Sequence, residues 1–360
     1  MRHRSTLGGG AAWTGATLAQ ADWMWQWQAD ELAALDTALA RSESLCADWR
    51  YLDAEHFPLG AAKARIKTAA TALEHGPGLV LLRGLPVARY STDQLKRLLL
   101  GIASHIGTPV YQSVRSELIS EIRDEGRAAL SRGTLRVEGQ EEVFLSSRAR
   151  AQTPGPLRFH TDRTDVVGLL CEQQAASGGL SQIVSAVAIH DEMLRRRPDL
   201  VDELYKDLPR SRLGEEQGGE KSFYLLPVFA LEQGAFTTHY SRTFVEAVAN
   251  LPDAPKVSEA QWAALDLLQT LAHELAVTHR FLPGDLQFLN SHVTYHARTA
   301  FADGVDTDSQ RNLLRVWLSA HQSRALPKSH AVLFGQTAPG ALRGGIRSAD
   351  GSLRPSAQTS

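Results

Sequence analysis

Two histidines and one aspartate in this chain have the types and the spacing of metal ligands. His160 and Asp162 are separated by a single residue, and His296 follows far downstream. On an extended segment, side chains two positions apart point to the same side, so His160 and Asp162 could bind one ion. Two imidazoles and one carboxylate make the facial triad that leaves coordination positions open on ferrous iron. The three residues therefore predict an iron centre that activates oxygen.

Two neighbouring residues compete with these ligands. Asp165 is another carboxylate, but its odd spacing from His160 places it on the opposite face of a strand. We expect Asp165 to orient the loop or to hold a side chain beside the metal. His292 lies close to His296 in the sequence, and we expect His292 to be a structural residue.

Zinc is the alternative metal, and it would give a different function. Zinc sites with two histidines and one carboxylate exist, but zinc has no redox chemistry. A zinc protease would more naturally carry a His-Glu-x-x-His motif on a helix, and the sequence contains none. Iron is therefore favoured, and a zinc hydrolase is kept as the alternative.

Two arginines follow the last proposed ligand. Arg311 and Arg315 lie four positions apart, so on a strand they face the same side. A guanidinium near the metal can clamp an acidic co-substrate through charge-assisted, bidentate hydrogen bonds. For Arg315 the alternative is a salt bridge that stabilises the fold.

Short strands alternate with a few longer helices along the chain. Apolar residues at helical spacing predict helices over 29–40, 61–73, 91–102 and 258–276. Apolar runs predict strands over 79–82, 166–171 and 315–318, and segments 223–229 and 235–240 predict a hairpin around 232–234. This mixture suits a mainly β fold with helical decoration (α+β), while the order of the strands stays open.

Composition divides the chain into three parts. Residues 1–20 and 338–360 are rich in Gly, Ser, Ala and Arg with little periodicity, which predicts flexible tails. Residues 21–337 are expected to form a single domain. Within it, charged residues interrupt the apolar pattern over 113–155, which predicts an inserted loop region of the kind that often binds ligands.

The bulk composition is ordinary for a soluble globular enzyme. With 43% hydrophobic and 22% charged residues and a net charge of −2, nothing favours nucleic acid or a membrane as a partner. No apolar run approaches the ~20 residues of a membrane helix. The two cysteines cannot build a disulfide framework, which fits the cytoplasm. Whether the chain forms a homo-oligomer is left open.

The order of these motifs resembles the Fe(II)/2-oxoglutarate-dependent dioxygenases of the taurine dioxygenase and clavaminate synthase-like family. The resemblance implies a double-stranded β-helix (jelly roll), with Fe(II), 2-oxoglutarate and O2 as cofactor and co-substrates. His296 precedes Arg311 by 15 positions (311 − 296), close to the family's spacing, which favours His296 over His292. The resemblance runs from about Gly76 to Leu318, and its specific segments are His160-Thr161-Asp162, Ser177-Gly178-Gly179, residues 283–290, His296-Ala297-Arg298 and Arg311 to Arg315.

The same resemblance assigns roles to residues around the metal. It implies that Arg311 binds the distal carboxylate of 2-oxoglutarate and that the Ser181 hydroxyl assists it. Relatives often have threonine in place of Ser181, and serine keeps the hydroxyl. Arg315 is expected to meet an anionic group of the primary substrate. Weaker pocket candidates are Gln112, Tyr240 and Arg242.

The expected function is an oxygenase that hydroxylates, or otherwise oxidises, an unactivated C–H bond of a small-molecule substrate. Succinate and CO2 would be released, and Arg315 suggests that the substrate is an acid. The alternative is a catalytically silent family member that binds a metabolite or serves as an assembly partner. The intact triad and both arginines argue against this alternative.

Overall fold

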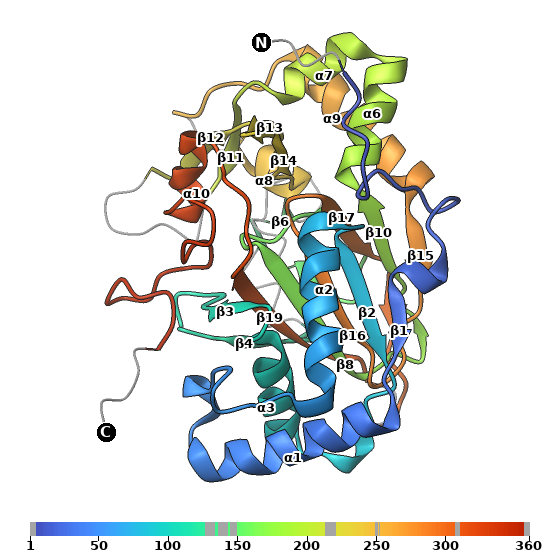
Figure 1. Cartoon of the computed structure of the whole chain (residues 1–360). Helices are drawn as coiled ribbons and strands as arrows, with labels where there is room; N and C mark the ends of the chain where they lie inside the picture. The colour runs from blue at the N-terminus through green and yellow to red at the C-terminus, as the bar shows by residue number, and fades with distance from the viewer. Residues whose placement is uncertain are drawn as a thin grey trace.

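Two β-sheets of unequal size lie at the centre of the structure, each covered on its outer face by helices (Figure 1). The computed structural model describes residues 5–126, 150–212, 221–248, 251, 253–306 and 310–355, and the backbone of two paired short strands, β5 (Thr134–Leu135) and β6 (Val143–Phe144).

The larger sheet has seven strands in the order β1-β2-β16-β8-β19-β3, and β4 also pairs with β19. Every pairing is antiparallel except that of β1 with β2. The strands are β1 (Met24–Gln26), β2 (Leu79–Arg83), β3 (Gly107–Val110), β4 (Ile119–Ile122), β8 (Val166–Gln173), β16 (Leu286–Asn290) and β19 (Asn312–Ala320).

The smaller sheet has four strands in the order β15-β10-β17-β7, all antiparallel. Its central strands pair over five residues, from Ser181 opposite Arg298 to Ser185 opposite Thr294. This register fixes the position of His296 on its strand. The strands are β7 (Leu157–His160), β10 (Ser181–Ser185), β15 (Val277–His279) and β17 (Thr294–Arg298).

Side-chain alternation on the strands separates the layers of the core. On β2, Val80 and Leu82 pack against helices, whereas Leu79 and Leu81 belong to the cluster between the sheets. All four side chains are fully buried, as the apolar run predicts for a strand covered on both faces. The covering helices are α1 (Ala29–Leu45), α2 (Lys63–His75) and α3 (Thr92–Ala103), and α2 crosses in front of β2 and β16 in Figure 1.

The smaller sheet is covered on its far side by a second group of helices. Val184 and Tyr295 point into the cluster that these helices form, while Ile183 points toward the larger sheet. The helices are α6 (Ala186–Arg196), α7 (Pro198–Leu204) and α9 (Glu259–Leu275). The sheets therefore pack face to face between two helical layers.

Short elements complete the described chain. Pairs of strands are β9 (Ser177–Gly178) with β18 (Phe301–Ala302), β11 (Leu208–Ser211) with β12 (Phe223–Leu226), and β13 (Phe229–Glu232) with β14 (Ala235–Thr238). Short helices are α8 (Arg242–Ala247) and α10 (Ala331–Phe334), with 3-10 turns at Gln20–Asp22, Trp49–Tyr51, Gly60–Ala62, Val87–Arg89 and Lys328–His330.

The helices and strands predicted from periodicity are present at the expected places, most of them one or two residues longer or shorter at their ends. The predicted hairpin is only partly right. Gln233 and Gly234 have φ of 51° and 80° and form the two-residue turn between β13 and β14. Residues 223–226, however, pair with β11 instead of extending this hairpin. The expected loop region 113–155 contains β4, which extends the larger sheet, and much of the rest lies outside the described residues.

Residues 5–20, which composition predicts to belong to a flexible tail, include side chains that contact the rest of the chain. Trp13 is 4% exposed, and its indole nitrogen donates to the carbonyl of Pro77 at 2.7 Å. The hydroxyl of Ser185 donates to the carbonyl of Ala11. A segment without periodicity can still bury single large side chains, because tryptophan brings a large apolar area to one position.

The C-terminal segment also contacts the rest of the chain through buried residues, among them Arg343 and Leu353. Arg343 is fully buried, and Nε of Arg343 donates to Asp165 at 2.8 Å. The backbone amide of Tyr111 donates to the carbonyl of Leu353 at 2.7 Å. Composition reports only local tendencies, whereas these contacts join both segments to distant parts of the chain. The limits of the domain, 21–337, remain a prediction.

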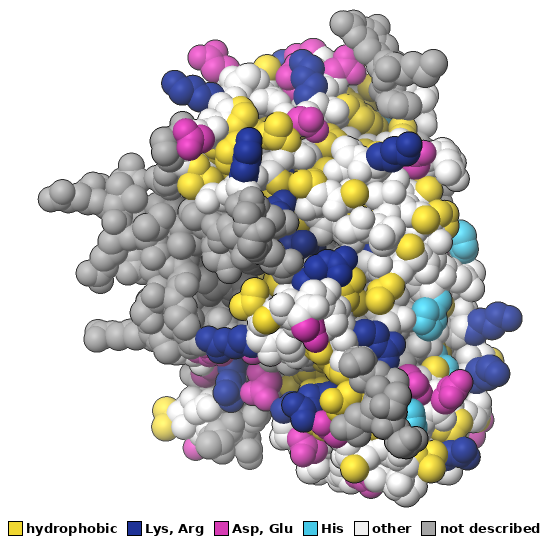
Figure 2. Space-filling model, turned by 90° about the vertical axis from the view of Figure 1, so that its left-hand side faces the viewer, with side chains coloured by type: hydrophobic (Ala, Val, Ile, Leu, Met, Phe, Trp, Pro, Cys, Tyr) yellow, Lys and Arg dark blue, Asp and Glu magenta, His cyan; other side chains and the backbone are white. Residues whose placement is uncertain are grey.

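The lengths of the helices and the charges on the surface are relevant to membrane and nucleic-acid binding. None of the helices in the described ranges is both long and apolar enough to cross a lipid bilayer. On the face shown in Figure 2, Lys and Arg side chains are interspersed with acidic and hydrophobic ones.

Candidate metal centre

Two antiparallel strands bring the histidines together. His160 is the last residue of β7, and it lies directly opposite His296 of β17. Their ring centroids are 4.2 Å apart. Residues that face each other on adjacent strands point to the same side of the sheet, so both imidazoles project from one face.

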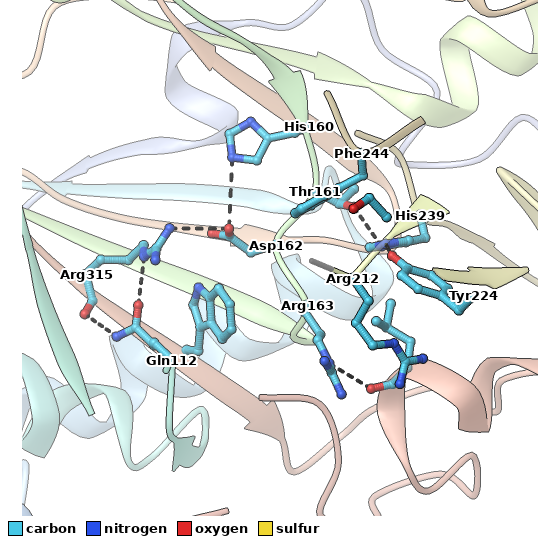
Figure 3. Close-up of a pocket in the computed structure, with 13 residues that line it drawn as sticks. Gln112, His160, Thr161, Asp162, Arg163, Arg212, Tyr224, His239, Phe244 and Arg315 are labelled. Atoms are coloured by element: carbon cyan, nitrogen blue, oxygen red, sulfur yellow. Dashed lines mark hydrogen bonds and ion pairs between the residues drawn. The ribbon is translucent and has the colours of Figure 1, made fainter. Parts of the chain in front are cut away.

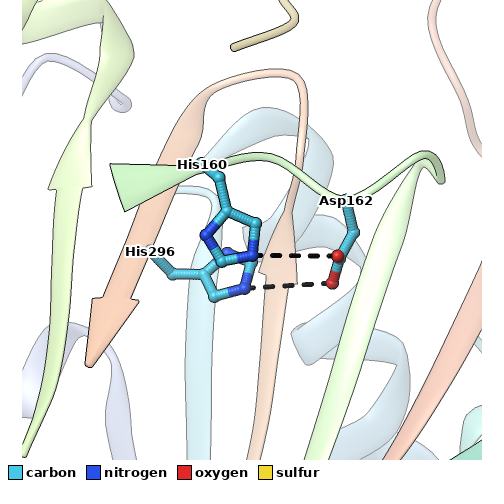
Figure 4. A group of neighbouring side chains, drawn as sticks. All are labelled: His160, Asp162 and His296. Atoms are coloured by element: carbon cyan, nitrogen blue, oxygen red, sulfur yellow. Dashed lines mark ion pairs between the residues drawn. The ribbon is translucent and has the colours of Figure 1, made fainter. Parts of the chain in front are cut away.

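The carboxylate comes from the loop that follows β7. The Nε2 atom of His160 lies 3.9 Å from Oδ1 of Asp162, and Nε2 of His296 lies 3.8 Å from Oδ2 (Figure 4). One ligand atom from each of the three residues lies within 4.8 Å of the others. This is the only such cluster among the residues that the structure describes.

The surroundings of these atoms fit a bound cation. Nδ1 of His160 lies 2.9 Å from the carbonyl of Arg158, which places its proton there and leaves the Nε2 lone pair facing Asp162. Oδ2 of Asp162 is buried and accepts no hydrogen bond from the described residues. A buried carboxylate oxygen without a donor is costly unless a cation binds it. Two nitrogen donors and one oxygen donor match the set that ferrous iron takes in this geometry.

Burial also sets the protonation of the ligands. It lowers the pKa of His160 and lowers the pKa of His296 to about 3. Burial alone would raise the pKa of Asp162, but Arg315 and the two imidazoles bring it below the ordinary value. At neutral pH the site therefore presents two neutral imidazoles and one carboxylate, the forms that bind metals.

The competing residues lie in a separate network, although Asp165 is in the loop between β7 and β8 rather than on the opposite face of a strand. Nε2 of His292 is 2.7 Å from Oδ1 of Asp165, and Arg343 donates to the same oxygen at 2.8 Å. The other carboxylate oxygen accepts from the backbone amide of Ala320 at 3.0 Å. Asp165 thus joins the loop after β7 to β19 and to the C-terminal segment, and it supports the site from outside.

One cavity extends from the histidines to Arg311. We call it the Arg311 cavity, and its empty space, part of which is open to solvent, amounts to about 480 Å³. Arg311 and Arg315 both line it, as expected for strand residues four apart. Its polar lining consists of His160, Ser181, His296, Arg298, Arg311 and Arg315.

The Arg311 side chain has the environment of an anion-binding group. Nη1 donates to the carbonyl of Ile122 at 3.2 Å, while Nε is buried without a partner among the described residues. The guanidinium lies 5.4 Å from the ring centre of Phe301. Burial lowers the pKa of Arg311 to about 10, so the group remains a cation at neutral pH. A buried cation with an unused donor favours a carboxylate ligand.

The Gly-Gly segment lies beside Arg311. Gly179 has a φ of +64°, which favours glycine, and a Cβ there would be in ordinary contact with Cδ of Arg311 at 3.5 Å and in a tight contact with Oε1 of Gln174 at 3.1 Å. Ser181 follows at the start of β10 and is 6% exposed. Arg298 stabilises the wall of the cavity, because its Nη atoms donate to the carbonyls of Ala151, Thr153 and Gly155 at 2.6–3.0 Å.

A second cavity shares His160 and Arg315 with the first. We call it the Tyr224 cavity, and its empty space, part of which is open to solvent, amounts to about 620 Å³ (Figure 3). His160, Asp162, Arg315 and Gln112 contribute to its wall. The sequence did not indicate the rest of the lining, which includes Thr161, Arg163, Arg212, Tyr224, His239 and Trp317.

A hydrogen-bonded chain connects the metal loop to the wall of the Tyr224 cavity. The hydroxyl of Thr161 lies 3.0 Å from Nδ1 of His239, and Nε2 of His239 lies 3.1 Å from the Tyr224 hydroxyl. The Arg212 guanidinium lies over the Tyr224 ring at 5.1 Å. Only the contact of β11–β14 with the loop after β7 assembles this chain, so no local sequence pattern could reveal it.

Of the three weaker pocket candidates, Gln112 lines a cavity, whereas Tyr240 and Arg242 do not. Gln112 lines the Tyr224 cavity, as proposed for a pocket residue. Tyr240 is buried against Tyr295, with ring centroids 5.2 Å apart. Arg242 pairs with Glu246 at 2.8 Å and with Asp266 at 2.6 Å. Tyr240 and Arg242 are therefore structural.

Buried histidines away from the metal predict acid sensitivity. Burial lowers the pKa of His239 and His292, and lowers that of His330 to about 3, whereas an unfolded chain protonates histidine near 6.5. The unfolded state therefore binds more protons as pH falls below about 6.5, and stability is lost by up to ~1.4 kcal/mol per pH unit for each histidine. Urea unfolding at pH 7.5, 6.5 and 5.5 measures this, and His330→Gln should make the dependence shallower. A free energy of unfolding that stays constant down to pH 5.5 would contradict it.

Comparisons with known proteins agree with this geometry. The model of the taurine catabolism dioxygenase TauD, TfdA family matches residues 42–317. An FR-33289 synthase of Streptomyces rubellomurinus is 32% identical over 285 residues, 77% of this chain and 79% of that protein. An L-asparagine oxygenase of Streptomyces coelicolor is 27% identical over 275 residues, 73% of this chain and 78% of that protein.

A solved structure shares the fold. It is an asparagine oxygenase in complex with Fe(II), 2S,3S-3-hydroxyasparagine and succinate, and it aligns with a TM-score of 0.61 at 18% identity. The alignment covers 82% of this chain and 93% of that chain. The mixed arrangement of helices and strands is thus that of TauD-like oxygenases. By sequence and by fold, the chain belongs to the TauD/TfdA family and is an Fe(II)- and 2-oxoglutarate-dependent dioxygenase.

Proposed function

We propose that this dioxygenase oxidises an unactivated C–H bond of a small, anionic metabolite, with hydroxylation as the basic outcome. The observation that carries the proposal is the position of the triad. His160 lines both the Arg311 cavity and the Tyr224 cavity, so a metal at this place faces two separate binding spaces. One space suits the co-substrate and the other suits the molecule that is oxidised.

The proposed metal ligands are His160, Asp162 and His296. When bound, Fe(II) with 2-oxoglutarate and O2 supplies the oxidising chemistry, and succinate and CO2 leave as products. The protein supplies position. Arg311 binds the distal carboxylate of 2-oxoglutarate, and the Ser181 hydroxyl donates to the same group. A keto acid held at its far end places its other end at the metal.

The substrate is proposed to occupy the Tyr224 cavity. Arg163, Arg212 and Arg315 line it, which favours an anionic group on the substrate. Burial keeps His239 neutral, so this side chain contributes hydrogen bonds rather than charge. The relatives include an asparagine oxygenase, and a small amino acid or a related acid has a suitable size.

For the fold, we propose that the two facing sheets form a double-stranded β-helix within a single dioxygenase domain. The face-to-face packing of the larger and smaller sheets supports this. The packed contacts of Trp13 and Arg343 suggest that the domain includes residues beyond 21–337.

A spectroscopic titration tests the proposed site. Addition of 2-oxoglutarate to the Fe(II)-loaded protein without oxygen should produce a metal-to-ligand charge-transfer band, because the keto acid would chelate the metal beside His160 and His296. Absence of the band would favour a protein that binds a metabolite without turnover. Zinc as the native metal, found by metal analysis of the isolated protein, would favour a hydrolase.

Succinate release then identifies the substrate. Candidate amino acids, their derivatives and other small carboxylic acids are added in turn to the loaded protein. A true substrate should raise succinate release above the rate seen without it, and the product should carry one additional oxygen when hydroxylation occurs.

A further inference from the structure

The two carboxylate oxygens of Asp162 have different surroundings. Oδ1 accepts a hydrogen bond from Nη1 of Arg315 at 3.3 Å. Oδ2 faces Nε2 of His296 at 3.8 Å and has no hydrogen-bond donor among the described residues. One oxygen is therefore held by the protein, and the other is left for a metal.

The Arg315 guanidinium is itself held in place. Its Nε donates to Oε1 of Gln112 at 2.7 Å, and the guanidinium lies 5.0 Å from the ring centre of Trp317. Figure 3 shows Arg315 between Gln112 and Asp162. The side chains of Arg315 and Asp162 are each 7% exposed, so solvent screens their interaction weakly.

Gln112 is the fixed end of this series of contacts. It is fully buried, and its Nε2 donates to the carbonyls of Arg315 and Leu118, both at 2.8 Å. These bonds determine which way the amide points, because the nitrogen faces two acceptors and the oxygen faces a donor. Gln112 thus joins the segment after β3 to both the backbone and the side chain of a residue in β19.

We infer that Gln112 and Arg315 are positioning residues for the metal ligand Asp162. Gln112 orients the Arg315 guanidinium, and Arg315 holds Oδ1 so that Oδ2 points at the metal between the two histidines. Outer partners of this kind set the orientation of a ligand before the metal binds. The inference rests on the proposed metal site and adds to it a role for Arg315 that does not require substrate.

Mn(II) binding, followed by the loss of its free-ion EPR signal, tests the inference without turnover. Arg315→Met and Gln112→Met should each weaken Mn(II) binding about 10- to 100-fold, the usual cost of losing an outer partner. Arg315→Lys keeps the positive charge but lacks the planar guanidinium that can bond to Gln112 and Asp162 together. Its loss of Mn(II) affinity should therefore be smaller than that of Arg315→Met. Arg324→Met is the matched control, because the Arg324 side chain is only 8% exposed, pairs with Glu74 at 2.9 Å and lines neither cavity beside the triad. It should leave Mn(II) affinity unchanged.

A second readout separates positioning from general damage. In the Fe(II) and 2-oxoglutarate complex, Gln112→Met should shift the charge-transfer band, because the orientation of the carboxylate ligand changes while the three ligands remain. Circular dichroism confirms that each variant is folded.

The outcomes decide between distinct ideas. Wild-type Mn(II) affinity in folded Arg315→Met and Gln112→Met would overturn the inference and leave Arg315 as a substrate contact alone. Failure of the unmodified protein to bind Mn(II) would instead overturn the proposed metal site.

Discussion

Asp162→Ala is expected to lose metal binding and, with it, coupled release of succinate. The substitution removes one of three ligands and leaves the Arg315 guanidinium, 3.3 Å from the lost oxygen, facing the two imidazoles. A site that was close to neutral before metal binding then carries a positive charge, which repels a cation. The loss of metal affinity should be greater than the about 10- to 100-fold that is typical when a residue that orients a ligand is removed.

Thermal unfolding with and without Mn(II) measures this loss in addition to EPR. A ligand present at 100 times its Kd stabilises the folded protein by about 2.7 kcal/mol, and Asp162→Ala should show no such increase. Asp165→Asn is the matched control, since Asp165 is a buried carboxylate three positions away that contacts His292 and Arg343. It should lower stability and reduce Mn(II) affinity far less than Asp162→Ala does, because all three proposed ligands remain. If Asp162→Ala bound Mn(II) as tightly as the unmodified protein, the triad would be wrong.

Arg311→Met is expected to weaken 2-oxoglutarate binding strongly while leaving metal affinity unchanged. Removal of one partner from a buried, hydrogen-bonded ion pair costs about 2–5 kcal/mol, which corresponds to roughly 30-fold or more in affinity. Arg298 cannot take over, because its Nη atoms are already bonded to the carbonyls of Ala151, Thr153 and Gly155. Titration of the charge-transfer band with 2-oxoglutarate gives the affinity directly.

A comparison of two keto acids shows which group Arg311 binds. 2-Oxovalerate has the same chain length as 2-oxoglutarate but lacks the distal carboxylate. The unmodified protein should strongly prefer 2-oxoglutarate, and Arg311→Met should lose most of this preference, since the two changes remove the same interaction. The preference of Arg311→Lys for 2-oxoglutarate should lie between that of the unmodified protein and that of Arg311→Met, because lysine keeps a charge but cannot form a bidentate pair. An unchanged preference in Arg311→Met would assign the carboxylate to another cation.

Much of the candidate site follows from short-range rules. Residue types and close spacing point to His160 and Asp162 as ligands, although strand parity does not apply to Asp162 and Asp165, which both lie in the loop after β7. The even spacing of Arg311 and Arg315 puts them in one cavity, where the structure has them. The strand over 79–82 and the helix that begins at Ser91 could also be predicted, because apolar runs and caps are local signals.

Other features depend on which segments meet. The amino-acid sequence alone determined the chemistry that the chain can offer, including two imidazoles, one carboxylate and two arginines at fixed intervals. Only the tertiary structure decided that His160 and His296 pair across β7 and β17, that Tyr224 and His239 line a second cavity, and that residues beyond both predicted domain limits are packed. Side-chain periodicity is a property of one element, whereas a cavity or a buried contact needs surfaces from several, and their meeting depends on packing throughout the chain.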